Sequence, residues 1–445
     1  MSQESDRSAD APAHGAVKPS ADLARDRGFV AHVVTQFLGA FNDNVFKQIL
    51  LLMFVAIPTA NGDADMQWVA TFFFALPFIL FSGFAGYLSD RHSKRRVIIA
   101  SKLAEVGVMA IGMGGFIIYG QTGLTMGLVI CLAAILFLMG AQSAFFGPGK
   151  YGILPEMMKP HLLPAANGFV LMTTFLAIIF GTALAGELLQ SLHNQLWIAG
   201  LVCVGIGLAG TATSCMLRPV RPAFPKLKLN ISHFGIPREV RSYLKNDRPL
   251  FHAIVVSSLF WMAASLVVMT VNAFGKEQLG LDDRWTARLN ASVSIGIAAG
   301  SFIAGTISKS RFHTGVMKTG AWGLAICLVL LAPPGWNSEH LLGFRLSIVA
   351  LIALGMFTGM FAVPLQVFIQ TSPPQEIRGR MLATQNLLNW IGIMLSAAIY
   401  VATGRLLDLV GLPPSMVFAT TALIMGSIAL FYRPVDANLA TGETG

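Results

Sequence analysis

Long apolar stretches recur from one end of this chain to the other, and they constrain its fold more than any other feature. Only 12% of the 445 residues are charged, whereas an average soluble protein has about 25%. A helix that crosses the hydrocarbon core of a bilayer needs about 20 residues. The sequence therefore predicts an all-α membrane protein with twelve transmembrane helices, roughly at 29–57, 68–88, 97–119, 124–146, 164–188, 194–217, 249–275, 286–308, 314–332, 346–370, 380–404 and 413–432.

The basic residues are distributed unevenly among the connections between these stretches. With the N-terminus placed inside, 24 of the 31 lysines and arginines fall on the inner side and 5 on the outer side. Cytoplasmic connections carry the excess of Lys and Arg in multi-pass membrane proteins. We therefore expect both termini in the cytoplasm. The net charge of +9 then follows from topology and does not indicate a nucleic-acid partner.

A long basic connection divides the twelve stretches into two sets of six. Val240, Tyr243 and Leu244 lie on one face of a short helix within it, which we expect at the membrane surface; a solvated linker is the alternative. The predicted organisation is a disordered cytoplasmic tail at 1–27, an N-terminal half at 28–217, the linker at 218–248, a C-terminal half at 249–433, and a second cytoplasmic tail at 434–445.

The two halves share short sequence matches at a nearly constant separation, which indicates a duplicated six-helix unit. A carrier built from two parallel repeats usually places its substrate site at their interface. The matching pairs are 86–90 with 305–309, 145–148 with 361–364, and 164–167 with 383–386.

The first apolar stretch is interrupted by polar side chains at 41–48, Phe-Asn-Asp-Asn-Val-Phe-Lys-Gln. A charged side chain at the bilayer centre costs about 2.5–3.5 kcal/mol, so such residues usually face a bundle interior or a water-filled path. Asp43 and Lys47 are four residues apart and can pair on one helix face. Asn42, Asn44 and Gln48 surround them. The cluster predicts where a polar group crosses the protein.

No feature of the chain indicates a cofactor or a reaction. The four cysteines lie within apolar stretches, so we expect neither a disulfide nor a metal site. No glycine-rich loop is present that would hold nucleotide phosphates, which argues against direct coupling to ATP hydrolysis. We expect a protein that is not an enzyme. The cysteines are Cys131, Cys203, Cys215 and Cys327.

The connection after the second stretch, 86–98, reads Gly-Tyr-Leu-Ser-Asp-Arg-His-Ser-Lys-Arg-Arg-Val-Ile. A glycine at its start permits close helix packing. An aspartate at a helix end can accept hydrogen bonds from another helix's N-terminus and from an arginine. The run resembles the signature loop of the major facilitator superfamily, with Ser93 in place of its second glycine. The resemblance implies a twelve-helix fold and a conformational latch formed by Gly86, Asp90, Arg91, Lys94 and Arg95.

Four further runs narrow this resemblance: 35–47, 148–156 (Pro-Gly-Lys-Tyr-Gly-Ile-Leu-Pro-Glu), 165–168 and 363–366. They are similar to the lysophospholipid transporter family of bacterial inner membranes, and at least as similar to the transporter domain fused to some glycerophospholipid acyltransferases. The resemblance implies a lipid flippase of the inner membrane. Such a protein would move a lysophospholipid from the outer to the inner leaflet by alternating access, for reacylation by a separate acyltransferase.

A lysophospholipid presents a phosphate, often an ammonium group, and one acyl chain. We expect Lys47 to bind the phosphate and Asp43 the ammonium group, assisted by Asn42, Asn44 and Gln48. An alternative is that Asp43 and Lys47 only neutralise each other. Further candidate binding residues are Lys150, beside a proline and a glycine, and the carboxamides Gln366 and Asn386 of the second half.

Two other functions remain open from the sequence. One is a proton-coupled carrier of small molecules, for efflux or uptake, with Asp43 as the coupling residue. The other is a scaffold for an acyltransferase that transports nothing, although this leaves the charges within the first stretch without a role. Oligomeric state and headgroup preference do not follow from the sequence.

Overall fold

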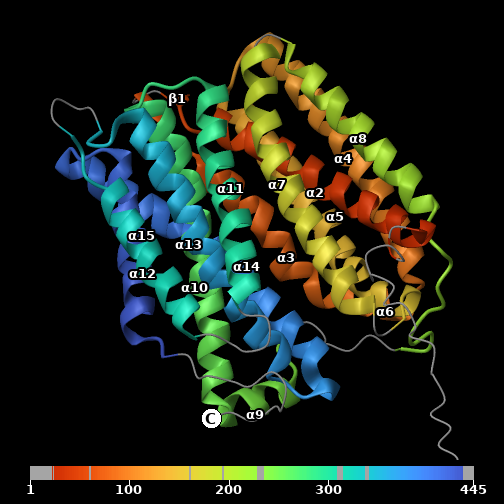
Figure 1. Ribbon diagram of the computed structural model, residues 1–445. Helices are drawn as coiled ribbons and strands as arrows, with labels where there is room; N and C mark the ends of the chain where they lie inside the picture. The colour runs from red at the N-terminus through yellow and green to blue at the C-terminus, as the bar shows by residue number, and fades with distance from the viewer. Residues whose placement is uncertain are drawn as a thin grey trace, which may run out of the picture.

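The computed structural model describes residues 23, 25–59, 62–159, 162–192, 195–227, 235–307, 314–335 and 340–433. Within them the chain folds into two side-by-side groups of long helices (Figure 1). Eleven of the described helices are long and apolar enough to cross a membrane. Helix α2 is the twelfth long helix, and the polar residues at its middle lower its hydropathy below that of the others. The all-α fold is confirmed.

The N-terminal half contains six long helices and a short one after α5. Asp26 caps α2, because its carboxylate accepts hydrogen bonds from the backbone N–H groups of Gly28 and Phe29. The helices are α2 (Arg27–Met53), α3 (Gln67–Arg91), α4 (Lys94–Thr122), α5 (Met126–Gly152), α6 (Leu154–Met157), α7 (Leu163–Leu192) and α8 (Trp197–Cys215).

The C-terminal half repeats this arrangement. Asp247 caps its first helix by accepting a hydrogen bond from the N–H of Leu250. The elements are α9 (Arg238–Asn246) in the linker, then α10 (Arg248–Ala273), the π-helical turn η4 (Phe274–Gln278), α11 (Asp283–Ile307), α12 (Thr314–Leu331), α13 (Gly343–Thr371), α14 (Gln375–Val410), the 3₁₀ turn η6 (Pro414–Met416) and α15 (Val417–Phe431).

Corresponding helices pair in the same way within each half, as the internal repeat predicts. Helices α3 and α5 pack together as α11 and α13 do. The pair α2 and α7 corresponds to α10 and α14, and the pair α4 and α8 to α12 and α15. The main connections between the halves are α7 with α11 and α3 with α14, and α10 makes smaller contacts with α2 and α3. Residues 308–309 of the first matched segment lie outside the described residues.

The bundle has two distinguishable ends. A hairpin of β1 (Ile57–Thr59) and β2 (Gly62–Ala64) follows α2 and marks the hairpin end. The linker helix α9 marks the opposite, linker end (Figure 1). The sequence analysis did not predict the hairpin, because three-residue strands are too short to show an alternating pattern.

Helix α9 confirms the helix predicted within the linker, but its apolar face packs on protein. Val240 is fully buried and Leu244 nearly so, in one cluster with Leu250 of α10. Arg380 of α14 forms an ion pair with Glu239. The helix therefore fastens the linker to the C-terminal half. Residues 1–22, 24 and 434–445 of the predicted tails lie outside the described residues.

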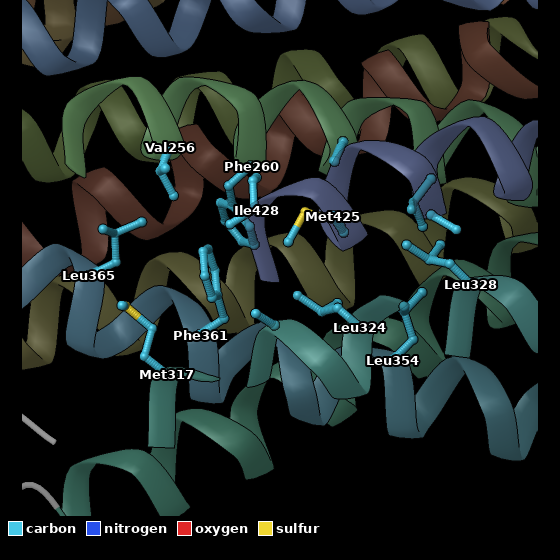
Figure 2. Packing of buried hydrophobic residues seen from close by; sticks show 14 of the residues in the cluster. Val256, Phe260, Met317, Leu324, Leu328, Leu354, Phe361, Leu365, Met425 and Ile428 are labelled. Atoms are coloured by element: carbon cyan, nitrogen blue, oxygen red, sulfur yellow. The ribbon is translucent and has the colours of Figure 1, made fainter. Parts of the chain in front are cut away.

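The interior of the C-terminal half is apolar and tightly packed. Figure 2 shows side chains of α10, α12, α13 and α15 meeting around Phe260 and Phe361, whose ring centroids are 5.4 Å apart. Glycines bring α11 and α13 into backbone contact, since a Cβ on Gly300 would lie 1.8 Å from the carbonyl oxygen of Met356. Small residues commonly permit such close approach between membrane helices.

Candidate substrate site

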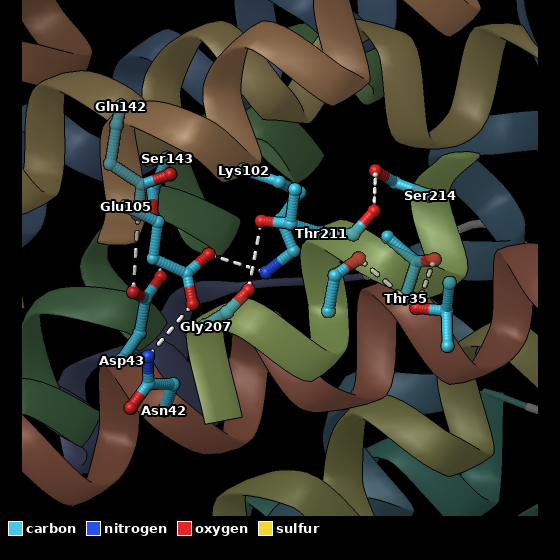
Figure 3. Close-up of polar contacts among 12 residues, drawn as sticks. Thr35, Asn42, Asp43, Lys102, Glu105, Gln142, Ser143, Gly207, Thr211 and Ser214 are labelled. Atoms are coloured by element: carbon cyan, nitrogen blue, oxygen red, sulfur yellow. Dashed lines mark hydrogen bonds and ion pairs between the residues drawn. The ribbon is translucent and has the colours of Figure 1, made fainter. Parts of the chain in front are cut away.

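Asp43 of α2 faces α5 and is bound there by neutral side chains. The hydroxyl of Ser143 donates to one carboxylate oxygen at 2.5 Å, and the amide of Gln142 donates to the other at 3.3 Å. Figure 3 shows both contacts. The described residues include no ion pair between Asp43 and Lys47, so the pairing that the sequence allowed does not form. One helical turn separates them, and each side chain finds another neighbour.

Lys47 extends toward the boundary between the two halves. Its ammonium nitrogen lies 5.2 Å from the centroid of the Phe74 ring of α3. Phe74 meets Trp390 of α14 edge-on at 5.9 Å, and Trp390 stacks on Phe78 at 3.6 Å. The Lys47 side chain is partly exposed. A cation thus lies beside an aromatic cluster to which both halves contribute.

The three carboxamides of the first helix point in different directions. Asn42 is fully buried and donates to Glu105 at 2.8 Å and to the Cys203 carbonyl at 3.1 Å. Asn44 donates to the carbonyl oxygen of Ala40 on its own helix. Gln48 donates to Asn272 of α10 at 2.9 Å. Successive helical residues are about 100° apart, so neighbours in sequence do not share one site.

A buried ion pair that was not predicted from the sequence lies behind Asp43. Lys102 and Glu105 of α4 pair with each other, and each side chain is at most 2% exposed. Lys102 belongs to the first third of α4, near the linker end, yet its side chain does not reach the surface. Gly39 of α2 and Gly210 of α8 make room for its side chain, because a Cβ at either position would lie within 3 Å of a Lys102 atom. The three-residue spacing of Lys102 and Glu105 places them on one face of a helix, and this spacing could have indicated the pair from the sequence.

A second cation lies nearer the linker end. Lys150 of α5 is 8% exposed and donates to the hydroxyl of Thr174 at 2.9 Å. Thr174 in turn donates to Gln36 of α2 at 2.9 Å. Gln36 and Lys47 are eleven residues apart on α2, a rise of about 16 Å. Lys150 and Lys47 therefore offer positive charge at two depths along the same helix.

The carboxamides predicted in the second half lie only partly together. Gln385 of α14 donates to Gln366 of α13 at 2.8 Å and to Ser257 of α10 at 3.1 Å. Asn386, the next residue of α14, is exposed and faces elsewhere. Gln366 thus belongs to a buried polar group of the C-terminal half, whereas the structure does not place Asn386 in it.

The loop motif binds its own half and the linker. Lys94 pairs with Glu156 of α6, and Arg95 donates to the carbonyl oxygen of Cys215 at the end of α8. Arg91 donates to the Tyr87 hydroxyl. The backbone carbonyl of Asp90 accepts from the N–H of Phe224 in the linker. The expectation that Gly86 permits close helix packing was wrong, since a Cβ there would meet no atom within 4 Å.

Polar contacts join the two halves at the hairpin end. Asn272 of α10 accepts from Gln48 and donates to Gln67 of α3 at 2.8 Å. Arg284 of α11 forms an ion pair with Glu187 of α7 at 2.7 Å. Beside that pair, a Cβ on Gly186 would lie 2.2 Å from the Cβ of Ala287. The hairpin end is closed in this structure.

Two repeated six-helix halves, with buried charge near their shared boundary, define a multi-pass membrane transporter. The sequence profile of the Major Facilitator Superfamily matches residues 33–397. The chain therefore belongs to the major facilitator superfamily, as its loop motif suggested.

Relatives and solved structures agree with this assignment. A lysophospholipid transporter LplT from Cronobacter sakazakii is 28% identical over 391 residues, covering 84% of this chain and 88% of that protein. One from Escherichia fergusonii is 29% identical over 396 residues, covering 87% and 90%. A D-xylose-proton symporter has the same fold at a TM-score of 0.67 and 14% identity, covering 94% of this chain and 99% of that one.

Proposed function

We propose that this protein transports a lysophospholipid, such as lysophosphatidylethanolamine, from the outer to the inner leaflet of the bacterial inner membrane. The observation that carries the proposal is the separation of Asp43 and Lys47. Their Cα atoms are about 6 Å apart along α2. The hydrogen-bond donors to Asp43 and the ring beside Lys47 are neutral, and among the described residues neither side chain forms a direct ion pair. A zwitterionic headgroup supplies one opposite charge to each. The lysophospholipid transporters among the relatives support this choice of substrate.

Lys47 and Asp43 each bind a different charged group of the substrate headgroup. Lys47 offers its ammonium group to the phosphate, and Asp43 accepts hydrogen bonds from the substrate ammonium group while Ser143 and Gln142 hold the carboxylate in place. Charge-assisted hydrogen bonds are roughly twice as strong as neutral ones. Phe74, Phe78 and Trp390 beside Lys47 offer an apolar surface to the acyl chain.

The distribution of basic residues orients the cycle. The linker end, which carries the loop motif and α9, lies in the cytoplasm with both termini, and the hairpin end faces outward. The closed hairpin end then corresponds to the inward-facing arrangement. Lys150 is linked through Thr174 to Gln36, which lies about 16 Å nearer the cytoplasm along α2 than Lys47, and it receives the phosphate as the halves move. A separate acyltransferase consumes the product.

A second function is favoured by the environment of Asp43. A partly exposed carboxylate held by a hydroxyl and an amide is also suited to bind and release a proton. Under this alternative the protein is a proton-coupled carrier of small molecules. Transport would then require a proton gradient, and Asp43→Asn would abolish the coupling while substrate exchange persisted.

Flipping of lysophosphatidylethanolamine in proteoliposomes tests the proposal. We expect Lys47→Met to lower the initial rate at least tenfold, because the phosphate loses its cation, and Asp43→Asn to lower it for zwitterionic more than for anionic lysolipids. Lys318→Met, which removes an exposed lysine of α12, is the matched control and should leave the rate within twofold of wild type.

Three outcomes would contradict the proposal. Flipping no faster than in protein-free vesicles would overturn the substrate assignment. Normal flipping by an Asp43→Asn/Lys47→Met double variant would show that these charges are structural. A strict requirement for a proton gradient would favour the second function.

A further inference from the structure

The carboxylate of Asp65 holds the two halves together at the hairpin end. Asp65 lies between β2 and α3, outside the membrane-spanning helices. One carboxylate oxygen accepts from the backbone N–H of Gln67 at 3.0 Å, and the other accepts from the Gln67 amide at 3.1 Å and from the Tyr400 hydroxyl. Tyr400 belongs to α14, so this last contact crosses between the halves and is broken when they separate.

Gln67 extends the contact into a chain of buried amides. It is fully buried and also donates to the Met269 carbonyl oxygen of α10 at 3.1 Å. Its amide oxygen accepts from Asn272, which accepts in turn from Gln48 and from Asn290 of α11. Five helices and the hairpin thus meet in one hydrogen-bonded network, and Asp65 is its charged member.

We propose that Asp65 is a proton-binding residue of the gate at the hairpin end, and that its protonation favours the closed gate. This proposal rests on the alternating access of the proposed function, which requires that the hairpin end open. It does not depend on which substrate is carried.

The direction of the effect follows from the surroundings of Asp65 in the closed state. Burial raises the pKa of Asp65 from its ordinary 3.8 to about 6, and the hydrogen bonds from Tyr400 and Gln67 partly oppose that rise. Opening removes Tyr400 and admits water, which returns the pKa toward its ordinary value. The closed state therefore binds the proton more tightly, so acidification favours closure. Between pH 7 and pH 5 the ratio of closed to open protein should rise about tenfold.

Other charged and titratable groups near this end have partners of their own. Glu187 of α7 pairs with Arg284 and lies near Arg288, both of α11, so these side chains also join the two halves. Asp283 pairs with Lys276, whose ammonium group also donates to the Leu52 carbonyl oxygen across the halves. Glu277 acts electrostatically on Tyr400. His340, whose pKa burial lowers, contacts Leu331 and Phe274 within the C-terminal half.

Distance measurements between spin labels test the proposal independently of transport. Labels on Gln121→Cys in the N-terminal half and Leu341→Cys in the C-terminal half, in a background without the four native cysteines, report opening of the hairpin end. Both positions are exposed. The full chain in lipid nanodiscs is measured by pulsed electron resonance from pH 4.5 to pH 8. We expect the closed-to-open ratio to rise on acidification below pH 6 and to be level above it.

Two variants and one control separate Asp65 from its neighbours. Asp65→Asn, a neutral mimic of the protonated residue, should be mostly closed and insensitive to pH. Tyr400→Phe removes a donor to the carboxylate, so the pH at which the ratio begins to rise should move above 6. His340→Gln should behave as wild type.

A ratio that does not change with pH, or that falls on acidification, would overturn the proposal, as would an unchanged pH response in Asp65→Asn. Because the assay contains no lysophospholipid, a failure of the gate proposal is distinguishable from a failure of the substrate assignment.

Discussion

The two halves of this protein share a helix arrangement but differ in what they bury. Among the described residues, the lysines and glutamates classed as buried all lie in the N-terminal half, namely Lys94, Lys102, Glu105 and Lys150. The C-terminal half instead buries a large apolar cluster together with neutral, hydrogen-bonded amides and hydroxyls. Figures 2 and 3 show the two interiors. The N-terminal half carries the charges that a polar substrate needs. The C-terminal half is tightly packed, and the N-terminal half moves against it.

Glycines illustrate the same difference. In the N-terminal half, Gly39 and Gly210 leave space for the flexible side chain of Lys102. In the C-terminal half, Gly300 and Gly355 bring backbones together, with added Cβ atoms 1.8 and 1.9 Å from carbonyl oxygens. Gly140 also brings α5 close to the backbone of α3 in the N-terminal half, with an added Cβ 2.4 Å from the Phe74 carbonyl oxygen, but the shortest of these distances lie in the C-terminal half.

Removing one partner of the buried ion pair should have the largest effect on stability. Glu105→Leu leaves Lys102 charged and unpaired in a dry interior, and we expect the free energy of unfolding in detergent to fall by about 3–5 kcal/mol. The Lys102→Met/Glu105→Leu double variant should recover most of that loss. Glu187→Ala, which breaks an exposed ion pair, is the control and should cost at most about 1 kcal/mol. A single variant as stable as the double would contradict the account.

Replacing a glycine by alanine should give the next largest difference between the halves, measured as a loss in the free energy of unfolding. Gly300→Ala forces backbones apart, and we expect a loss of about 3 kcal/mol in the free energy of unfolding, at the upper end for overpacking. Gly39→Ala meets only the end of Lys102, which can move, so the loss should be about 1 kcal/mol. Thermal unfolding of both variants measures the difference. The reverse order would show that Lys102 is held more rigidly than the helices.

Removing a single hydroxyl group from each half should give the smallest difference between the halves. Ser143→Ala removes a donor to the carboxylate of Asp43, and a hydrogen bond to a charged group is worth about 1.5–3 kcal/mol, so we expect about tenfold slower flipping. Ser257→Ala removes a donor to the neutral side chain of Asn389, and flipping should stay within twofold of wild type. Equal effects would mean that both halves contribute equally to the headgroup site.

Much of the fold could be predicted from the sequence, and less of the site. Apolar stretches located the helices because bilayer thickness sets a length that each helix must reach. Asp43 and Lys47 were recognised as charges within a membrane-spanning stretch, but their pairing was inferred from spacing alone. The structure places Ser143 and Phe74 beside them instead, from helices some 100 and 27 residues away along the chain. The burial of Lys102 could not be predicted for the same reason, because the glycines around it lie on two other helices.

By itself the sequence determined the membrane setting, the twelve helices, their duplication and the presence of charged side chains within the first helix. These properties depend on local composition and periodicity, because bilayer thickness fixes the length of a spanning helix and the helix repeat fixes which residues share a face. Only the tertiary structure decided which partner each polar side chain meets. The bond between Asp65 and Tyr400 spans 335 positions, and it forms only because the packing of the two halves brings α14 against α3.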